Sequence, residues 1–574
     1  MGRYRLVRIV TGTVILAWIA TAGWLCLIQA PPTWDGGDHS FHALRIHQAL
    51  QHMDPGLMNR FTREQNLWPF LHSWITGIFL WIFGGSFLTI RCVSLLAALL
   101  TMLLTAGFTH HYQTVISSGT RADPDTDSAP AVSLFSRSWG WLSAFILAGS
   151  PIFFLYAVQP MLEIFGAAVT IAVLWCVAAA YVPTRREPSR NTSPSPSVAG
   201  FLSRRNRLNT LAGLLLVAAF FIKYIYAILL VASLAVTFGY QWFCGMSRRV
   251  PDARRGSFLP VRFIDPVLWF APVTGAAAIW FSRAPALKGF LVFRDNPDTG
   301  FGLLDPVNWI IYPVTVLLYY CSTPLLGFLG IWLAIRASRF RPSPFTALAG
   351  VYFLTTLIML TIYRYKLIRA PFTVIPCLAF LTAAGIAHLY RHPIRNRRTD
   401  QTVRAAIVLA LVVNGGVAAL PREAFRYVPI WKNEIDYMLN FDSKLAPALS
   451  EIGSRITDTR DLCITGEFNA VSSLQLAYFI RTAHNEILDP IPSLFAWNQP
   501  RESVNLVPEL HNRGFRRCLI LSVRHGSVYD TPDYIEKFAW MSRHLVRPSP
   551  ESEFHQVWSL AWDNGLTAEF WDTR

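Results

Sequence analysis

Long apolar runs constrain this chain more than any other feature of its sequence. A helix that crosses about 30 Å of hydrocarbon needs roughly 20 mostly apolar residues, and most of the runs approach or exceed that length. We expect crossings near residues 9–28, 88–108, 139–157, 164–182, 209–222, 224–243, 266–282, 309–335, 345–363, 371–390 and 404–420. The run at 209–243 is divided at Lys223, because a lysine within a single span would lie at the bilayer centre. The chain is therefore expected to be a polytopic α-helical membrane protein.

The composition agrees with this fold class and excludes several others. Only 15% of the 574 residues are charged, whereas a soluble protein carries about 25%. The net charge is +16, of which residues 1–420 carry +20 and residues 421–574 carry −4. The basic excess lies in short loops between apolar runs, as the positive-inside rule requires, and no basic face interleaved with aromatic residues suggests nucleic acid as a partner. Disordered, collagen-like, coiled-coil and nucleic-acid-binding proteins are excluded.

The basic loops also set the expected topology. Four Arg-rich segments should be cytoplasmic together with the N-terminus: 183–207, 244–265, 336–344 and 391–404. All four share that side only if the apolar run Trp68–Phe83 does not cross the membrane, so we expect this run to lie as a juxtamembrane helix in the outer interface. The prediction is about eleven transmembrane helices in residues 1–420, with residues 29–87 as the first outer loop.

Residues 421–574 change character and predict a small extracytoplasmic α/β domain. Short apolar strands alternate in it with helical segments. The strands are Asp461–Gly466 and Arg517–Val523, and the helical segments are Ser472–Arg481 and Glu502–Arg513. Each strand contains one cysteine, so Cys463 and Cys518 are candidates for a disulfide.

Two acidic residues stand out on the expected outer side. Asp38 follows two glycines and opens a helical segment, where it is either a helix N-cap or a functional carboxylate. Glu163 lies between two spans, where an acid is costly; it is either functional or a snorkelling interface residue. Asp35 is the next candidate if Asp38 has no role. Four histidines lie close to Asp38, but no carboxylate completes a zinc-type spacing with them, so no metal site is indicated.

Basic residues surround the same region. Lys223, Lys366 and Arg369 occupy turns on the expected outer side, and Arg91 lies just inside an apolar helix. Each of them singly could anchor a helix at the membrane interface. Together with two carboxylates, they suit a phosphate leaving group beside a hydroxyl or amine that must lose a proton. We expect Lys223, Lys366 and Arg369 to converge at one level of the outer leaflet.

The order of these motifs resembles the GT-C glycosyltransferases that use polyprenyl-phosphate sugars. The closest resemblance is to the aminoarabinose–lipid A transferases and the protein O-mannosyltransferase-like families (glycosyltransferase families 39 and 83). The matching segments, which together cover nearly the full chain, are Asp38–Phe41, Trp68–Trp74, Phe83–Arg91, Tyr156–Glu163, Phe220–Lys223 and Lys366–Pro376. The sequence departs from the family pattern at His39, where the families carry a Glu, and at Leu67-Trp68, where they carry Glu-Lys.

This resemblance implies a GT-C fold and a membrane glycosyltransferase that needs no cofactor. The enzyme would move a hexose or pentose from a polyprenyl-phosphate sugar donor to a lipid, glycan or protein acceptor on the outer side of the membrane. Asp38 and Glu163 would be the catalytic carboxylates. The residues that would bind the donor phosphate are Lys223, Lys366, Arg369 and Arg91.

The implied location is the inner or plasma membrane, with the N-terminus in the cytoplasm and the C-terminal domain outside. Two alternatives remain open. One is a transporter or flippase of a lipid-linked glycan, although the internal repeats common in transporters are not visible in the sequence. The other is a non-catalytic subunit of a glycan-assembly system.

Overall fold

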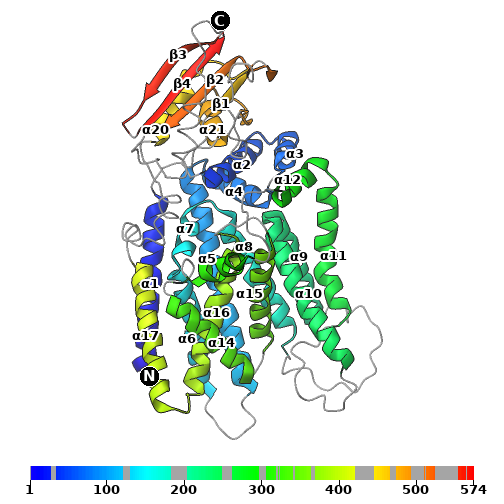
Figure 1. The fold of residues 1–574 in the computed structure, drawn as a ribbon, viewed down its shortest axis with the longest axis vertical. Helices are drawn as coiled ribbons and strands as arrows, with labels where there is room; N and C mark the ends of the chain where they lie inside the picture. The colour runs from blue at the N-terminus through cyan, green and yellow to red at the C-terminus, as the bar shows by residue number, and fades with distance from the viewer. Residues whose placement is uncertain are drawn as a thin grey trace.

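The computed structural model shows a helical bundle capped at one end by a small sheet (Figure 1). The N-terminus lies at the end of the bundle away from the sheet, and the C-terminus lies at the sheet. The structure describes residues 2–27, 34–66, 68–119, 129–182, 203–247, 262–295, 305–317, 321, 324–340, 343–363, 369–419, 445–465, 473–492, 510, 512–523, 554–563 and 565–573.

Within these residues, nine helices are long and apolar enough to cross a membrane. They are α1 (Gly2–Cys26), α5 (Phe87–Gly119), α8 (Leu162–Ala180), α9 (Arg204–Ile222), α10 (Tyr224–Ser247), α11 (Ile264–Phe281), α15 (Pro344–Ile362), η3 (Ala370–Val374) continued by α16 (Ile375–Arg391), and α17 (Arg397–Ala419). The predicted break at Lys223 is confirmed: its backbone is extended (φ −163°, ψ 124°) and separates α9 from α10. These helices confirm the polytopic fold class.

If one bent pair of helices is counted as a single span, the described residues hold ten candidate crossings. α6 (Ala129–Ala148) and α7 (Pro151–Val158) meet at an angle of 76°. Ser150 caps α7 by accepting a hydrogen bond from the backbone N–H of Phe153, and Pro151 occupies the first helical position, where no N–H is needed. The bend therefore has a local cause in the sequence.

The expected single crossing at 309–335 is wrong. The structure forms two helices there, α13 (Pro306–Thr315) and α14 (Pro324–Phe340). Pro313 lies inside α13 and Pro324 begins α14, and each proline lacks the backbone N–H that a continuous helix would use. α14 packs against α16 within the bundle.

Three shorter helices lie between the bundle and the sheet (Figure 1). They are α2 (Trp34–Gln51), α3 (Pro55–Glu64) and α4 (Leu71–Phe83). α4 has 13 residues and is apolar, and at 1.5 Å per residue it is too short to cross about 30 Å of hydrocarbon. It packs closely on α2: a Cβ on Gly77 would lie 2.6 Å from the Ile46 side chain. α4 thus has the length expected of a juxtamembrane helix. A fourth short helix, α12 (Ala284–Asp295), follows α11.

The C-terminal region forms a four-stranded sheet in the order β1-β2-β4-β3. Its elements are α20 (Leu445–Arg455), β1 (Leu462–Thr465), α21 (Ser473–Ala483), β2 (Arg517–Val523), β3 (Phe554–Ala561) and β4 (Leu566–Thr573). Both predicted strands are present and run parallel to each other, whereas the antiparallel β3–β4 hairpin was not predicted. The expected domain boundary after residue 420 and most of the expected helix Glu502–Arg513 lie outside the described residues.

The candidate disulfide is not formed. Cys463 and Cys518 are register partners on β1 and β2, and both are buried as free cysteines. Parallel pairing brings their backbones together, and the two thiols pack in a small apolar cluster with Leu510, Phe554 and Trp571. Burial raises the pKa of the Cys463 thiol.

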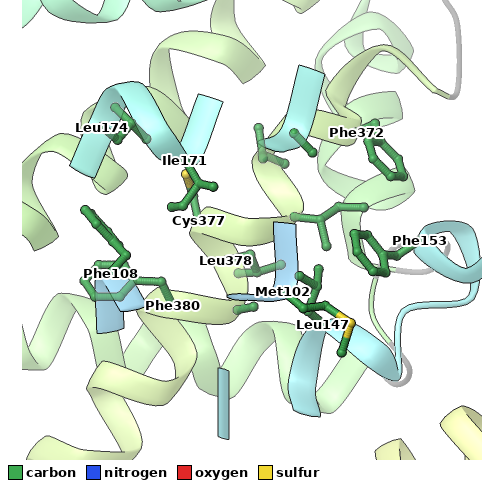
Figure 2. Close-up of a cluster of buried hydrophobic side chains, with 14 of the residues drawn as sticks. Met102, Phe108, Leu147, Phe153, Ile171, Leu174, Phe372, Cys377, Leu378 and Phe380 are labelled. Atoms are coloured by element: carbon green, nitrogen blue, oxygen red, sulfur yellow. The ribbon is translucent and has the colours of Figure 1, made fainter. Parts of the chain in front are cut away.

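The bundle core joins the helices that carry the site described below (Figure 2). Side chains from α5, α6, α7, α8, η3 and α16 interlock in it, among them Met102, Leu147, Ile171 and Leu378. The rings of Phe153 in α7 and Phe372 in η3 stack with centroids 6.2 Å apart. This packing fixes η3 against α7.

Candidate functional site

Three charged side chains from separate parts of the chain meet at one place. Glu163 lies in the first turn of α8, Lys223 in the break between α9 and α10, and Arg369 directly before η3. Lys223 Nζ donates a hydrogen bond to Glu163 Oε1 at 2.8 Å, and Arg369 Nε lies 3.8 Å from the same oxygen. Glu163 is 2% exposed and Lys223 is 8% exposed. One buried carboxylate thus faces two cations.

Local structure explains each position. The first turn of a helix favours a carboxylate because the unpaired backbone N–H groups there carry partial positive charge, and Glu163 occupies such a turn. The extended backbone at Lys223 keeps this residue out of both neighbouring helices. Arg369 is positioned by η3, whose Phe372 ring packs on Tyr156 and Phe153.

A second carboxylate comes from α2. Asp35, in the first turn of that helix, forms an ion pair with the Arg369 guanidinium. Asp35, Glu163, Lys223 and Arg369 together form what we call the charge cluster. Residues three and four apart share a helix face, so Asp38 and His39 lie on the same side of α2 as Asp35. Asp38 is half-buried.

Aromatic and imidazole rings surround the cluster. Lys223 Nζ lies 4.6 Å from the centroid of the Trp68 ring and 5.7 Å from that of Tyr226, distances at which a cation is attracted to a ring face. The His39 ring lies 6.1 Å from Trp68 and 5.5 Å from the His72 ring. These rings partly replace the water that a lysine in solution would have.

Both imidazoles are held neutral. Burial lowers the pKa of His39 far below its ordinary value, and the nearby positive charges of Lys223 and Arg369 lower it further. Burial also lowers the pKa of His72 to about 4, although Glu163 opposes the shift. At neutral pH the region therefore contains two imidazoles without charge, each able to accept a proton.

The C-terminal region holds α2 in place. Arg45 of α2 is 1% exposed, and its guanidinium lies 3.5 Å from the Asp489 carboxylate. Gln48 forms two hydrogen bonds with the backbone just before Asp489, at 3.1 and 2.9 Å. At the other end of α2, a Cβ on Gly37 would lie 2.7 Å from the Gln475 side chain of α21. A larger residue here would displace the Gln475 side chain from this close contact, which lies two residues from Asp35.

Some of the predicted site residues come together in the structure. Glu163, Lys223 and Arg369 come together, and Asp38 lies one helical turn from Asp35, the carboxylate that pairs with Arg369. Arg91 lies in the second turn of α5 with a fully buried side chain. Lys366 lies outside the described residues, so its expected place beside Lys223 stays a prediction.

Sequence reasoning gave Asp35 only as a reserve and gave no role to His39, His72 or Trp68. Their signal in the sequence was weak, because single polar or aromatic residues in a short loop have many structural uses. The described residues include no group of three or more His, Cys, Asp or Glu side chains placed to hold a metal ion.

Comparison with known proteins finds solved structures with a similar fold. No family model and no curated protein sequence matches the chain. Among solved structures, the apo form of ArnT from Cupriavidus metallidurans matches with a TM-score of 0.53 and 14% identity, over 99% of this chain and 98% of ArnT. The structure of the same protein bound to undecaprenyl phosphate matches with a TM-score of 0.51 and 14% identity, over 98% of each chain. The resemblance to the GT-C glycosyltransferases is thus confirmed at the level of fold.

Proposed function

We propose that the chain is a membrane glycosyltransferase that takes a sugar from a polyprenyl-phosphate-linked donor and transfers it to an acceptor on the outer side of the membrane. The observation that carries this proposal is the buried charge cluster. A buried ion pair gains little stability over apolar residues of the same volume, so its presence inside a membrane protein needs a functional reason. The ArnT fold, solved in one case with undecaprenyl phosphate bound, supports the donor class.

The chemistry follows from the charges. When the sugar leaves the phosphate, negative charge grows on the phosphate oxygens, and cations fixed beside it stabilise the transition state. Lys223 and Arg369 are the described cations for this role, and we assign Lys366 and Arg91 to the same phosphate region. Ammonium and guanidinium groups form strong charge-assisted hydrogen bonds with phosphate.

The carboxylates serve the other half of the reaction. We assign Asp38 to the acceptor, which it would orient or deprotonate, with Glu163 as its partner. In the structure, Glu163 pairs with Lys223 and Asp35 pairs with Arg369. A donor phosphate would compete with these carboxylates for Lys223 and Arg369. The two carboxylates hold these cations in position.

The proposed orientation places the site outside. The N-terminus would be cytoplasmic, and the C-terminal α/β region, residues 421–574, would lie on the outer side of the inner or plasma membrane. Arg-rich loops support this orientation through the positive-inside rule. Polyprenyl-phosphate sugars then suit the site better than cytosolic nucleotide sugars.

The test is transfer by the purified protein in proteoliposomes. A panel of polyprenyl-phosphate sugars with labelled sugar groups is supplied with envelope lipid, glycan and protein fractions as acceptors. We expect one donor to lose its label to an acceptor, and Glu163→Gln to abolish the transfer. Lys288→Met, at an exposed lysine of α12, is the matched control and should transfer normally. Absence of transfer with every donor and acceptor would contradict the proposal.

A further inference from the structure

Two imidazoles beside the charge cluster have no part in the function proposed above. His39 is 5% exposed and His72 is 1% exposed. Their ring centroids lie 5.5 Å apart, and the His72 ring also packs edge-on against Phe165 at 4.9 Å. His72 Nδ1 is buried and has no hydrogen-bond partner within the described part of the chain. Because a buried polar atom without a partner is costly, this arrangement needs an explanation.

The carboxylates of the cluster are poor candidates for removing a proton. Glu163 accepts a hydrogen bond from Lys223, and Asp35 is paired with Arg369. A carboxylate held by a cation is stabilised in its charged form, which makes it a weak base. The imidazoles carry no such bond to a cation among the described contacts, and a neutral imidazole keeps one nitrogen lone pair for a proton.

We propose that Asp38 orients the acceptor hydroxyl while His39 is the base that receives its proton, and that the donor phosphate makes His39 competent by neutralising Lys223 and Arg369. His72 stands beside it as the next proton carrier. This inference rests on the proposed function and adds to it a residue and an order of events: the donor binds before the base can act.

The surroundings of His39 carry the electrostatic part of the argument. The titratable and charged groups that act on the two imidazoles are His42 on α2, Glu163 on α8, Lys223 at the α9–α10 break and Arg369 before η3, and Arg369 is itself paired with Asp35. In the free protein, burial and the cations hold His39 in its neutral form and suppress its basicity. A phosphate placed between Lys223 and Arg369 brings negative charge to the same region and favours the protonated imidazole.

The proposed step balances as follows. The acceptor oxygen forms a bond to the anomeric carbon of the sugar, and its proton moves to a ring nitrogen of His39. The bond between the anomeric carbon and the phosphate oxygen breaks, and its electron pair stays on the polyprenyl phosphate, whose charge becomes more negative by one. Lys223 and Arg369 face that charge. The imidazolium of His39 then releases its proton to His72 or to water.

The experiment measures the pH dependence of undecaprenyl phosphate binding to the full-length protein in nanodiscs, between pH 5 and pH 8. If binding makes His39 more basic, binding takes up one proton, and by linkage the affinity rises about tenfold per pH unit as the pH falls through the window of uptake. The probe's own ionisation affects every variant equally. His39→Gln removes the titrating group and should remove this slope.

His47→Gln is the matched control. His47 lies on the same helix and is 8% exposed, but its ring packs against Gly85 rather than at the cluster. We expect wild type and His47→Gln to share one pH profile of affinity for undecaprenyl phosphate. As the pH falls from about 6.5, the ordinary histidine pKa, to about 5, their affinity should rise tenfold more per pH unit than that of His39→Gln. His39→Asn serves as the second variant if His39→Gln does not fold, as judged by its thermal midpoint in detergent.

The outcomes separate this inference from the proposed function. Binding by all variants with one common pH profile would overturn the role of His39 and leave the glycosyltransferase proposal standing. No binding of undecaprenyl phosphate by wild type at any pH would overturn the proposed function, and this inference with it. A retained slope in His39→Gln that disappears in His72→Gln would also contradict the inference, because it would assign the proton to His72.

Discussion

Removing one charge from the charge cluster should be worse for folding than removing two. Lys223→Met keeps an apolar stem of similar length but leaves Glu163, which is 2% exposed, with only Arg369 at 3.8 Å in the contacts described. Breaking a buried ion pair by removing one partner costs about 3–5 kcal/mol, because the remaining charge is buried without compensation. We expect a loss of that size in the free energy of unfolding.

The double variant Lys223→Met/Glu163→Gln removes both charges. An uncharged pair of similar volume is often as stable as the ion pair it replaces, so the double variant should recover most of the loss. The assay is denaturation of the purified protein in detergent, followed by tryptophan fluorescence. Lys288→Met, the same change at an exposed lysine, is the control and should stay within about 0.5 kcal/mol of wild type.

The same variants separate folding from phosphate binding. The double variant should fold but bind undecaprenyl phosphate about 10–150-fold more weakly, because a hydrogen bond to a charged group is worth about 1.5–3 kcal/mol. Glu163→Gln alone should bind it more tightly than wild type, since it removes the carboxylate that competes for Lys223. The reasoning is refuted if Lys223→Met is as stable as Lys288→Met, if the double variant is no more stable than Lys223→Met, or if it binds the lipid like wild type.

Three further predictions follow from the sequence and the site. A reporter fused after Gly245 should indicate cytoplasm and one after Arg574 the outer side; a cytoplasmic C-terminus would reverse the proposed topology. Asp38→Asn should abolish transfer in a folded protein, whereas Asp54→Asn, at the N-cap of α3, should leave transfer and stability nearly unchanged because Asn caps a helix about as well as Asp; near-normal transfer by Asp38→Asn would move the role to Asp35. Burial lowers the pKa of His72 to about 4, so below pH 6.5 the unfolded chain binds this proton before the folded chain does, and stability should fall by about 2 kcal/mol at pH 5. Melting curves of His72→Gln should lack that part of the decrease, and an unchanged pH profile would contradict the buried neutral state.

The spans were predictable because length and polarity decide them locally. Lys223 interrupts an apolar run that is otherwise continuous, and the helix ends there as expected. The error at 309–335 has an equally local cause, since Pro313 and Pro324 lie within that run. A hydropathy average does not register such prolines, although each one removes a backbone hydrogen bond from a continuous helix.

The site was predictable in its residue types but not in its pairing. Lys223 and Glu163 are 60 residues apart, and only the packing of α8 against α9 brings them together. Asp35 and Asp38 share one face of α2, so no periodicity could show which of them meets Arg369. The histidines carried even less signal, because a buried imidazole is defined by its neighbours from other helices, and His72 lies on a different helix from His39.

The central claim is that Lys223 and Arg369 receive the phosphate of a polyprenyl-phosphate donor. A cryo-electron microscopy structure of the full chain with undecaprenyl phosphate tests it most directly. We predict phosphate oxygens within hydrogen-bonding distance of Lys223 Nζ and of the Arg369 guanidinium, about 2.7–3.2 Å, with at least one of these cations released from its carboxylate. A phosphate bound elsewhere on the protein, with the Lys223–Glu163 pair still closed at 2.8 Å, would contradict the claim.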